Sequence, residues 1–378
     1  MPDQVPVVTP ERNELMQLVQ QLHASASPWV PSGFGNHLHW GAALQPDAGS
    51  TLSMARINRV LQHAVDDFTV TVEAGLPLEQ LQQVLAEKGQ WLPLDPPVAG
   101  PSSIGGLVAR GLSGRLQHHY RGLRDQLLGL SLLRSDGTAA KAGGQVVKNV
   151  AGYDLMRLFT GSWGSLGLIS EITLRTMPLP QARRLLRVSG PLLQLQELRQ
   201  HLLLQSPLAF EFIQWRQGPG AAALMLGLVS LDNTELQHQH QQLLQLLPLG
   251  LELDHCNSET EQPLAADQWL LRLGLEPVQA HSLLQSPAAM GWQLQLGAAS
   301  GIGLGLAKLR DMVPYKVETL RRACKQFGGY LTVLQGPSHH PIAAWEDAPS
   351  RRVIEAVKHQ FDPLQQLCRG RLPGVCSN

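Results

Sequence analysis

Residues 101–114 read Pro-Ser-Ser-Ile-Gly-Gly-Leu-Val-Ala-Arg-Gly-Leu-Ser-Gly, within a proline- and glycine-rich stretch that has no sustained apolar period. The chain has 36 glycines, and others of them concentrate at 33–35, 143–144 and 161–167. Glycine lets the main chain approach a ligand closely, and such loops expose successive backbone N–H groups that can bind a diphosphate. Although any single loop could be an ordinary turn, the set predicts one extended, phosphate-bearing ligand.

The flanking residues follow the periods of regular secondary structure. Thr9-Pro10 is typical of a helix start, and the residues of 69–73 alternate as in a strand. Asp136-Gly137 predicts the turn of a hairpin. A strand pattern over 165–177 ends at Pro178, where we expect the first domain boundary.

The stretch 181–336 is rich in leucine and glutamine, and its apolar residues follow the helical period in some segments and the strand period in others. We expect strands at 185–188, 209–215, 221–231, 293–296 and 330–334, and helices at 192–204, 235–247 and 317–327. The part between 247 and 293 has no clear pattern. This mixture indicates an α+β layer structure.

Composition excludes several classes of protein. Thirty basic and thirty acidic residues cancel, which does not favour nucleic-acid binding. The four cysteines form no CxxC pair, so neither a zinc site nor an iron–sulfur cluster is expected, and we predict no metal. No signal peptide is visible, and the longest apolar run, 221–231, is far shorter than a bilayer span. We therefore expect a cytoplasmic protein, either soluble or held peripherally at the membrane by partners.

Two common nucleotide-binding signatures are absent. No GxxxxGK[ST] string occurs, which excludes a Walker-type NTPase. Gly301-Ile-Gly-Leu-Gly305 resembles a dinucleotide fingerprint but lacks the third glycine at the required spacing and a recognisable βαβ unit. A Rossmann site is therefore not predicted.

Three strings, taken in order, resemble a known flavoprotein family. They are Pro31-Ser-Gly-Phe-Gly-Asn36, then 101–114 followed by Tyr120-Arg-Gly-Leu-Arg-Asp125, then Gly143-Gly-Gln-Val-Val-Lys-Asn-Val-Ala-Gly-Tyr-Asp154 with Gly161-Ser-Trp-Gly-Ser-Leu-Gly167. The order is similar to the FAD domain of the p-cresol methylhydroxylase/vanillyl alcohol oxidase superfamily. The third string and the ending Phe361-Asp-Pro363 … Gly370-Arg-Leu-Pro373 resemble its 2-hydroxy-acid branch, in particular the E-type FAD-binding subunit of glycolate dehydrogenase (glycolate oxidase).

The resemblance implies an α+β fold, with a two-subdomain FAD-binding domain at 1–180 and an inserted ferredoxin-like α+β cap at 181–340. Residues 341–378 would return to the FAD domain. The implied cofactor-binding residues are Pro31, Ser32, Gly33, Phe34, Gly35, Asn36, Ser103, Ile104, Gly105, Gly106, Ala109, Gly111, Ser113, Gly122, Arg124, Gly167 and Ile169. Lys148, Asn149, Tyr153 and Asp154 fit either a cofactor contact or a structural network beneath the flavin. Some members attach flavin to a histidine in the first glycine loop; Asn36 stands at that position here, so non-covalent FAD is expected.

The implied reaction is the oxidation of a small 2-hydroxy acid such as glycolate to the 2-oxo acid, by hydride transfer to flavin. The implied partners are a homologous catalytic flavoprotein subunit and an iron–sulfur subunit. The catalytic subunits carry a Glu-His-Gly-x-Gly string that this chain lacks; Gly336-Pro-Ser-His-His340 is the nearest candidate, and no catalytic residue is assigned. Two alternatives remain open: an accessory FAD-binding subunit without its own turnover, and a stand-alone flavin oxidase of another alcohol or sugar acid.

Overall fold

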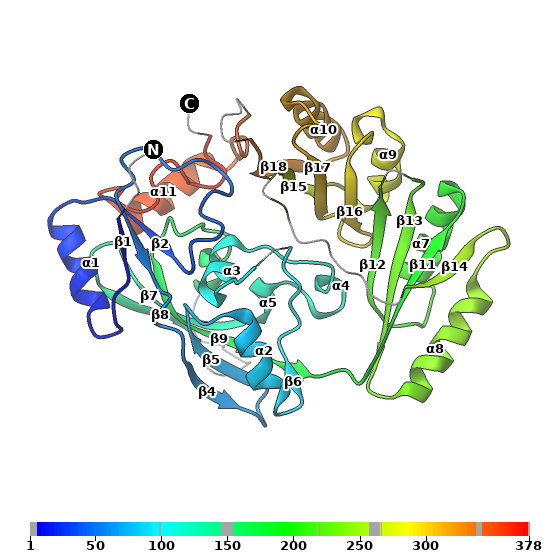
Figure 1. Cartoon of the computed structure of the whole chain (residues 1–378), viewed down its shortest axis with the longest axis horizontal. Coiled ribbons are helices and arrows are strands. Elements are labelled where there is room, and N and C mark those ends of the chain that lie inside the picture. The colour runs from blue at the N-terminus through cyan, green and yellow to red at the C-terminus, as the bar shows by residue number, and fades with distance from the viewer. Residues whose placement is uncertain are drawn as a thin grey trace. The chain divides into compact units, whose positions relative to one another are not determined.

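The computed structural model describes residues 6–97, 100–144, 154–218, 220–256, 265, 267–337 and 342–376 (Figure 1). Its contacts divide the chain into two compact units. The first unit comprises the residues up to 113, 122–178 and those from 345 on, and the second comprises 114–121 and 179–344. The chain therefore leaves the first unit twice, once for a short segment and once for a long insertion.

The first unit contains two main sheets. A parallel sheet has the order β1-β3-β2, with β1 at Val7–Val8, β2 at Trp29–Ser32 and β3 at Ser50–Ser53. An antiparallel sheet has the order β4-β5-β9-β7-β8, with strands Val60–Ala64, Thr69–Glu73, Leu168–Arg175, Leu127–Leu133 and Ala139–Gly143. The short strands β6 (Gln90–Trp91) and β10 (Met177–Pro178) pair with each other. The predicted strand 69–73 and the hairpin at Asp136-Gly137 both form.

The described part of this unit also contains six helices: α1 (Leu15–Ala24), α2 (Leu78–Ala86), α3 (Ile104–Arg110), α5 (Leu123–Gln126), α6 (Met156–Phe159) and α11 (Arg351–Phe361). The predicted helix start at Thr9-Pro10 is wrong, because α1 begins at Leu15. The intervening chain forms a turn in which the Glu11 N–H donates to the Glu14 carboxylate at 2.9 Å. Val70 and Val72 of β5 pack with Ile104, Leu107 and other apolar residues of α3 in one core, so the sheet fixes the position of that helix.

The buried carboxylate of Asp362 holds the C-terminal segment against this unit. Asp362, with no exposed surface, accepts hydrogen bonds from the backbone N–H groups of Gln366 at 3.0 Å and Leu367 at 2.8 Å. The Lys358 ammonium donates to the same carboxylate at 2.5 Å and to the Leu367 carbonyl at 2.9 Å. These hydrogen bonds hold Leu367 beside Trp29 of β2, and the two residues form a parallel β-bridge.

The second unit is built around one antiparallel sheet of eight strands, in the order β14-β11-β13-β12-β16-β17-β15-β18. Its strands are β11 (Ala182–Ser189), β12 (Phe210–Gln217), β13 (Ala223–Ser230), β14 (Glu252–Cys256), β15 (Gln268–Gly274), β16 (Gln293–Gly297), β17 (Gly303–Lys308) and β18 (Tyr330–Gln335). Its helices are α4 (Gln117–Tyr120), α7 (Leu192–Leu204), α8 (Asn233–Leu246), α9 (Ala280–Gln285), α10 (Pro314–Gln326) and the 3₁₀ turns Pro277–Gln279 and Pro287–Ala289.

The sheet order reveals an internal repeat. In chain order, β11-α7-β12-β13-α8-β14 and β15-α9-β16-β17-α10-β18 are both strand-helix-strand-strand-helix-strand units. Each has its strands in the spatial order fourth, first, third, second, and the two second strands, β12 and β16, join the halves. The ferredoxin-like arrangement expected of the insertion therefore occurs twice. Among the described residues, no helix is long and apolar enough to cross a membrane.

Candidate functional site

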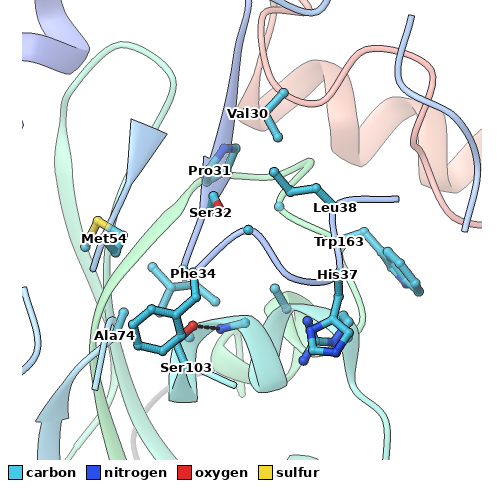
Figure 2. A pocket seen from close by; sticks show the side chains of 18 of the residues that line it. Val30, Pro31, Ser32, Phe34, His37, Leu38, Met54, Ala74, Ser103 and Trp163 are labelled. Atoms are coloured by element: carbon cyan, nitrogen blue, oxygen red, sulfur yellow. Dashed lines mark hydrogen bonds between the residues drawn. The ribbon is translucent and has the colours of Figure 1, made fainter. Parts of the chain in front are cut away.

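A pocket of the first unit lies where β2, the loop that follows it, α3 and the loop before β9 come together (Figure 2). Twelve of the predicted cofactor-binding residues line it: Pro31, Ser32, Gly33, Phe34, Gly35, Asn36, Ser103, Gly105, Gly106, Ala109, Gly167 and Ile169. Residues from three separate glycine-rich strings thus border one cavity.

The other five predicted residues are not part of this lining. Ile104 is fully buried in the core, and Gly111 ends α3 in a left-handed conformation with φ 62°. The Ser113 hydroxyl accepts a hydrogen bond from the Leu123 N–H at 3.4 Å, Gly122 precedes α5, and Arg124 is exposed. These residues shape the chain that leads away from the pocket.

The first glycine loop and α3 touch at a point that only glycine allows. A Cβ atom at Gly33 would lie 2.0 Å from the Ser103 hydroxyl oxygen, far inside van der Waals contact. That hydroxyl is already committed, because it accepts a hydrogen bond from the Gly106 N–H at 3.2 Å and caps α3. The Asn36 side-chain amide adds a bond to the Pro101 carbonyl at 3.0 Å. Gly33 therefore permits the close approach that makes the pocket wall.

Three successive backbone N–H groups of this loop remain available. The N–H groups of Phe34, Gly35 and Asn36 donate to no atom in the part of the chain that the structure describes. Gly35 has φ 81°, and its carbonyl accepts the Leu38 N–H at 3.2 Å, which turns the loop tightly. Consecutive free N–H groups in such a turn are a binding site for an anion.

The side chains that line the pocket carry positive charge. Arg110 and Arg371 contribute to the lining, whereas no Asp or Glu is among the lining residues that the structure describes. Burial lowers the pKa of Arg371, whose guanidinium donates to the Ala42 carbonyl at 2.9 Å and to the Leu38 carbonyl. Burial also lowers the pKa of Arg110 to about 10. The loop is therefore held from the C-terminal segment by Arg371.

Several lining residues were not predicted from the sequence, among them His37, Trp163, Arg110, Cys368 and Arg371. Figure 2 shows His37 and Trp163 on the opposite side of the view from Phe34 and Ala74. Arg110 lies within the glycine-rich string 101–114, and a lone positive charge there could have indicated a contact with an anion. Cys368 and Arg371 come from the far end of the chain, and only the resemblance of the tail pointed to them.

The residues present fit a flavin nucleotide. The close approach at Gly33 and the unused N–H groups suit a diphosphate, and the absence of carboxylates from the lining agrees with an anionic ligand. Lys148, Asn149, Tyr153, His339 and His340 lie outside the described residues. Asp154 is described and pairs with Arg157 at 3.4 Å on the surface.

Comparisons with known proteins agree with this geometry. Residues 6–143 match the family described as "FAD binding domain". The chain is 34% identical over 174 residues to glycolate oxidase subunit GlcE of Escherichia coli, covering 46% of this chain and 49% of the relative. It is 37% identical over 182 residues to the mitochondrial D-lactate dehydrogenase [cytochrome] of Arabidopsis thaliana, covering 48% and 31%. It is 33% identical over 178 residues to D-2-hydroxyglutarate dehydrogenase of Xanthomonas citri, covering 47% and 38%.

The chain therefore spans between 31% and 49% of the length of these curated relatives. The fold as a whole has a solved counterpart in alkyldihydroxyacetonephosphate synthase, with a TM-score of 0.69 at 16% identity, over 97% of this chain and 77% of that one. Residues 6–143 accordingly form a domain of the family described as "FAD binding domain", and the chain shares its fold with alkyldihydroxyacetonephosphate synthase.

Proposed function

We propose that this chain is the FAD-bearing subunit of a glycolate (2-hydroxy acid) dehydrogenase complex. The observation that carries the proposal is the pocket in which the glycine strings meet, because its described lining combines free N–H donors, the buried Arg371, the partly buried Arg110 and no carboxylate. The similar proteins are named for glycolate, D-lactate and D-2-hydroxyglutarate, each of which is a 2-hydroxy acid. Their shared chemistry supports this class of substrate.

The reaction removes a hydride from the carbon that bears the hydroxyl group and a proton from that hydroxyl. Bound flavin would supply the acceptor for the two electrons. This chain would hold the diphosphate with the N–H groups of Phe34, Gly35 and Asn36, and Arg371 would keep that loop in place. Gly167 and Ile169 would border the cofactor with their main chain. The cofactor-binding roles of the other predicted residues belong to the same proposal. So does non-covalent binding of FAD, because Asn36 stands where some members have the histidine that is linked to flavin.

We assign the base that accepts the hydroxyl proton to no residue of this chain. The proposed partners, a homologous catalytic flavoprotein and an iron–sulfur subunit, would complete the reaction and carry the electrons away. Glycolate oxidase subunits from Escherichia coli and Bacillus subtilis are among the similar proteins, which supports an assembly of related flavoproteins.

The test is the visible spectrum of the purified protein, taken under anaerobic conditions before and after glycolate is added. A flavin spectrum that bleaches supports oxidation by this chain unaided. A flavin spectrum that bleaches only when the catalytic subunit is added supports the complex. A protein that binds no FAD after reconstitution would overturn the proposal, and flavin that stays with acid-precipitated protein would overturn non-covalent attachment.

A further inference from the structure

Arg110 is the last residue of α3, and its side chain runs back along the helix into the pocket. Its Nη2 atom lies 3.5 Å from the Ser102 hydroxyl oxygen, and a Cβ atom at Gly106 would lie 3.8 Å from Nη1. Long side chains on helices point toward the N-terminus in this way. The Arg110 guanidinium carbon also lies 5.6 Å from the centre of the Trp40 ring. The charge is thus placed beside the first turn of α3, on the pocket wall.

The guanidinium of Arg110, a partly buried residue, lacks the partners that the buried arginines of the chain have. Arg199 and Arg371 donate to backbone carbonyls at 2.8 and 2.9 Å, and Arg321 donates to Glu318 at 2.7 Å. Among the described residues Arg110 meets no carboxylate and no carbonyl, and its buried Nε has no acceptor. Its single polar neighbour, the Ser102 hydroxyl at 3.5 Å, is at the limit of a hydrogen bond. A desolvated cation without a counter-charge is costly, so the site calls for an anion.

The pocket itself indicates which anion fits. Its lining holds Arg110 and Arg371, no Asp or Glu, and the N–H groups of Phe34, Gly35 and Asn36. Gly33 and Gly106 both present their bare Cα atoms to the Ser103 hydroxyl, so main chain and guanidinium border the same space. In FAD, the group that is always ionised at neutral pH is the diphosphate. A substrate carboxylate is the competing source of negative charge.

We propose that Arg110 holds the diphosphate of FAD through a charge-assisted contact, so that the pocket discriminates flavin nucleotides from riboflavin. The inference rests on the proposed function, since it takes FAD as the ligand. It goes beyond that function because it assigns nucleotide selection to one side chain. Backbone donors alone would bind the same group without this added charge.

The experiment compares the apoprotein with its Arg110→Met and Arg110→Lys variants. FAD and riboflavin are each titrated, and binding is followed by quenching of flavin fluorescence. Arg56→Met is the matched control, because Arg56 is an exposed arginine of the same unit that pairs only loosely with Glu11, at 3.4 Å. Thermal unfolding of each apoprotein is measured with and without FAD.

The charge-assisted contact predicts that Arg110→Met weakens FAD binding by roughly 10- to 100-fold and leaves riboflavin binding unchanged. Arg110→Lys should retain part of the FAD affinity, and Arg56→Met should retain all of it. The apoprotein of Arg110→Met should unfold at the same temperature as the wild type or higher, because a partly buried charge without a counter-charge is removed. Its stabilisation by FAD should be smaller.

Other outcomes overturn the inference in distinguishable ways. Equal losses of FAD and riboflavin affinity, with a less stable apoprotein, would make Arg110 a structural residue. Unchanged FAD affinity would refute the diphosphate contact while the proposed function stands. A raised KM for glycolate with unchanged FAD affinity would assign the charge to the substrate carboxylate. A wild-type protein that binds neither flavin would refute this inference and the proposed function together.

Discussion

Removal of the Asp362 carboxylate should destabilise the first unit more than removal of any exposed acid. Asp362→Ala deletes the acceptor of three hydrogen bonds and leaves the Lys358 ammonium, 12% exposed, without its counter-charge. Breaking a buried pair by removing one partner costs about 3–5 kcal/mol, and we take about 3 because Lys358 keeps some contact with water. In urea, with a slope of about 3 kcal/mol per molar, the unfolding midpoint should fall by about 1 M.

The assay is equilibrium unfolding of the apoprotein in urea, followed by tryptophan fluorescence and circular dichroism. Asp347→Ala is the control, because Asp347 also sits in the C-terminal segment and bonds to Arg351 and the Cys376 N–H, but it is half exposed. An exposed pair is screened by water, so that midpoint should hardly change. A midpoint that Asp362→Ala shifts no further than Asp347→Ala does would show that the buried carboxylate contributes no more stability than an exposed one.

Three further predictions follow from buried groups. In Gly33→Ala the new Cβ would clash with the Ser103 hydroxyl at 2.0 Å, so FAD affinity should fall roughly tenfold or more in a fluorescence titration, whereas Gly218→Ala, with no atom within 4 Å, should bind FAD as the wild type does. Burial raises the pKa of Glu73, but hydrogen bonds from Arg59 and Arg12 outweigh this effect and lower the pKa below the usual 4.5. The stability that Glu73 contributes should therefore be present above pH 4.5 and lost as the pH falls further. Acid unfolding of Glu73→Gln should accordingly depend less steeply on pH than that of the wild type. Burial raises the pKa of the Cys324 thiol to about 12 and that of Cys368 to about 11, so a thiol reagent at pH 8 should modify Cys256 and Cys376 first and the other two only in urea; rapid reaction of all four without denaturant would contradict the buried placement.

Much of the first unit was predictable because its signals are local. The strand at Thr69–Glu73 forms where the sequence alternates, although all its residues except Thr71 are buried. The turn at Asp136-Gly137 needs a glycine, and Gly137 has φ 80°. The glycines of the pocket are likewise set by close approach of main chain, which a sequence records directly. Twelve predicted residues therefore line a common pocket, and their contacts with FAD remain a prediction.

The second unit was harder to predict, because its two strand-helix-strand-strand-helix-strand units share an arrangement of elements but no recurring residue pattern. The 13-residue α7 corresponds to the six-residue α9, flanked by two 3₁₀ turns, so no spacing recurs in the sequence. Strands β14, β15 and β17 and helix α9 were not predicted. Gly301 lies before β17 with φ 68°, whereas Gly303 and Gly305 lie within that strand. A Cβ at Gly303 would lie 1.8 Å from the Gln295 carbonyl oxygen on the neighbouring strand. Strand contact, and not a nucleotide, accounts for that glycine.

The sequence alone did not predict which arginines lie at the pocket. Arg124 lies in a suggestive string yet is exposed, whereas Arg371, more than 300 residues from the first glycine loop, holds that loop in place. Which arginine is buried depends on long-range packing. No local pattern records it.

The return of the C-terminal segment to the first unit has a consequence for synthesis on the ribosome. Leu367 belongs to the core that β5 and α3 share, but it is translated only after the whole 179–344 insertion. At about 5–20 residues per second, that insertion takes roughly 10–30 s to emerge. During this interval the nascent first unit lacks the segment that covers Trp29, and at its end the insertion has all its described strands. The domain that begins first is therefore expected to finish last, and chaperone binding should be concentrated in that interval.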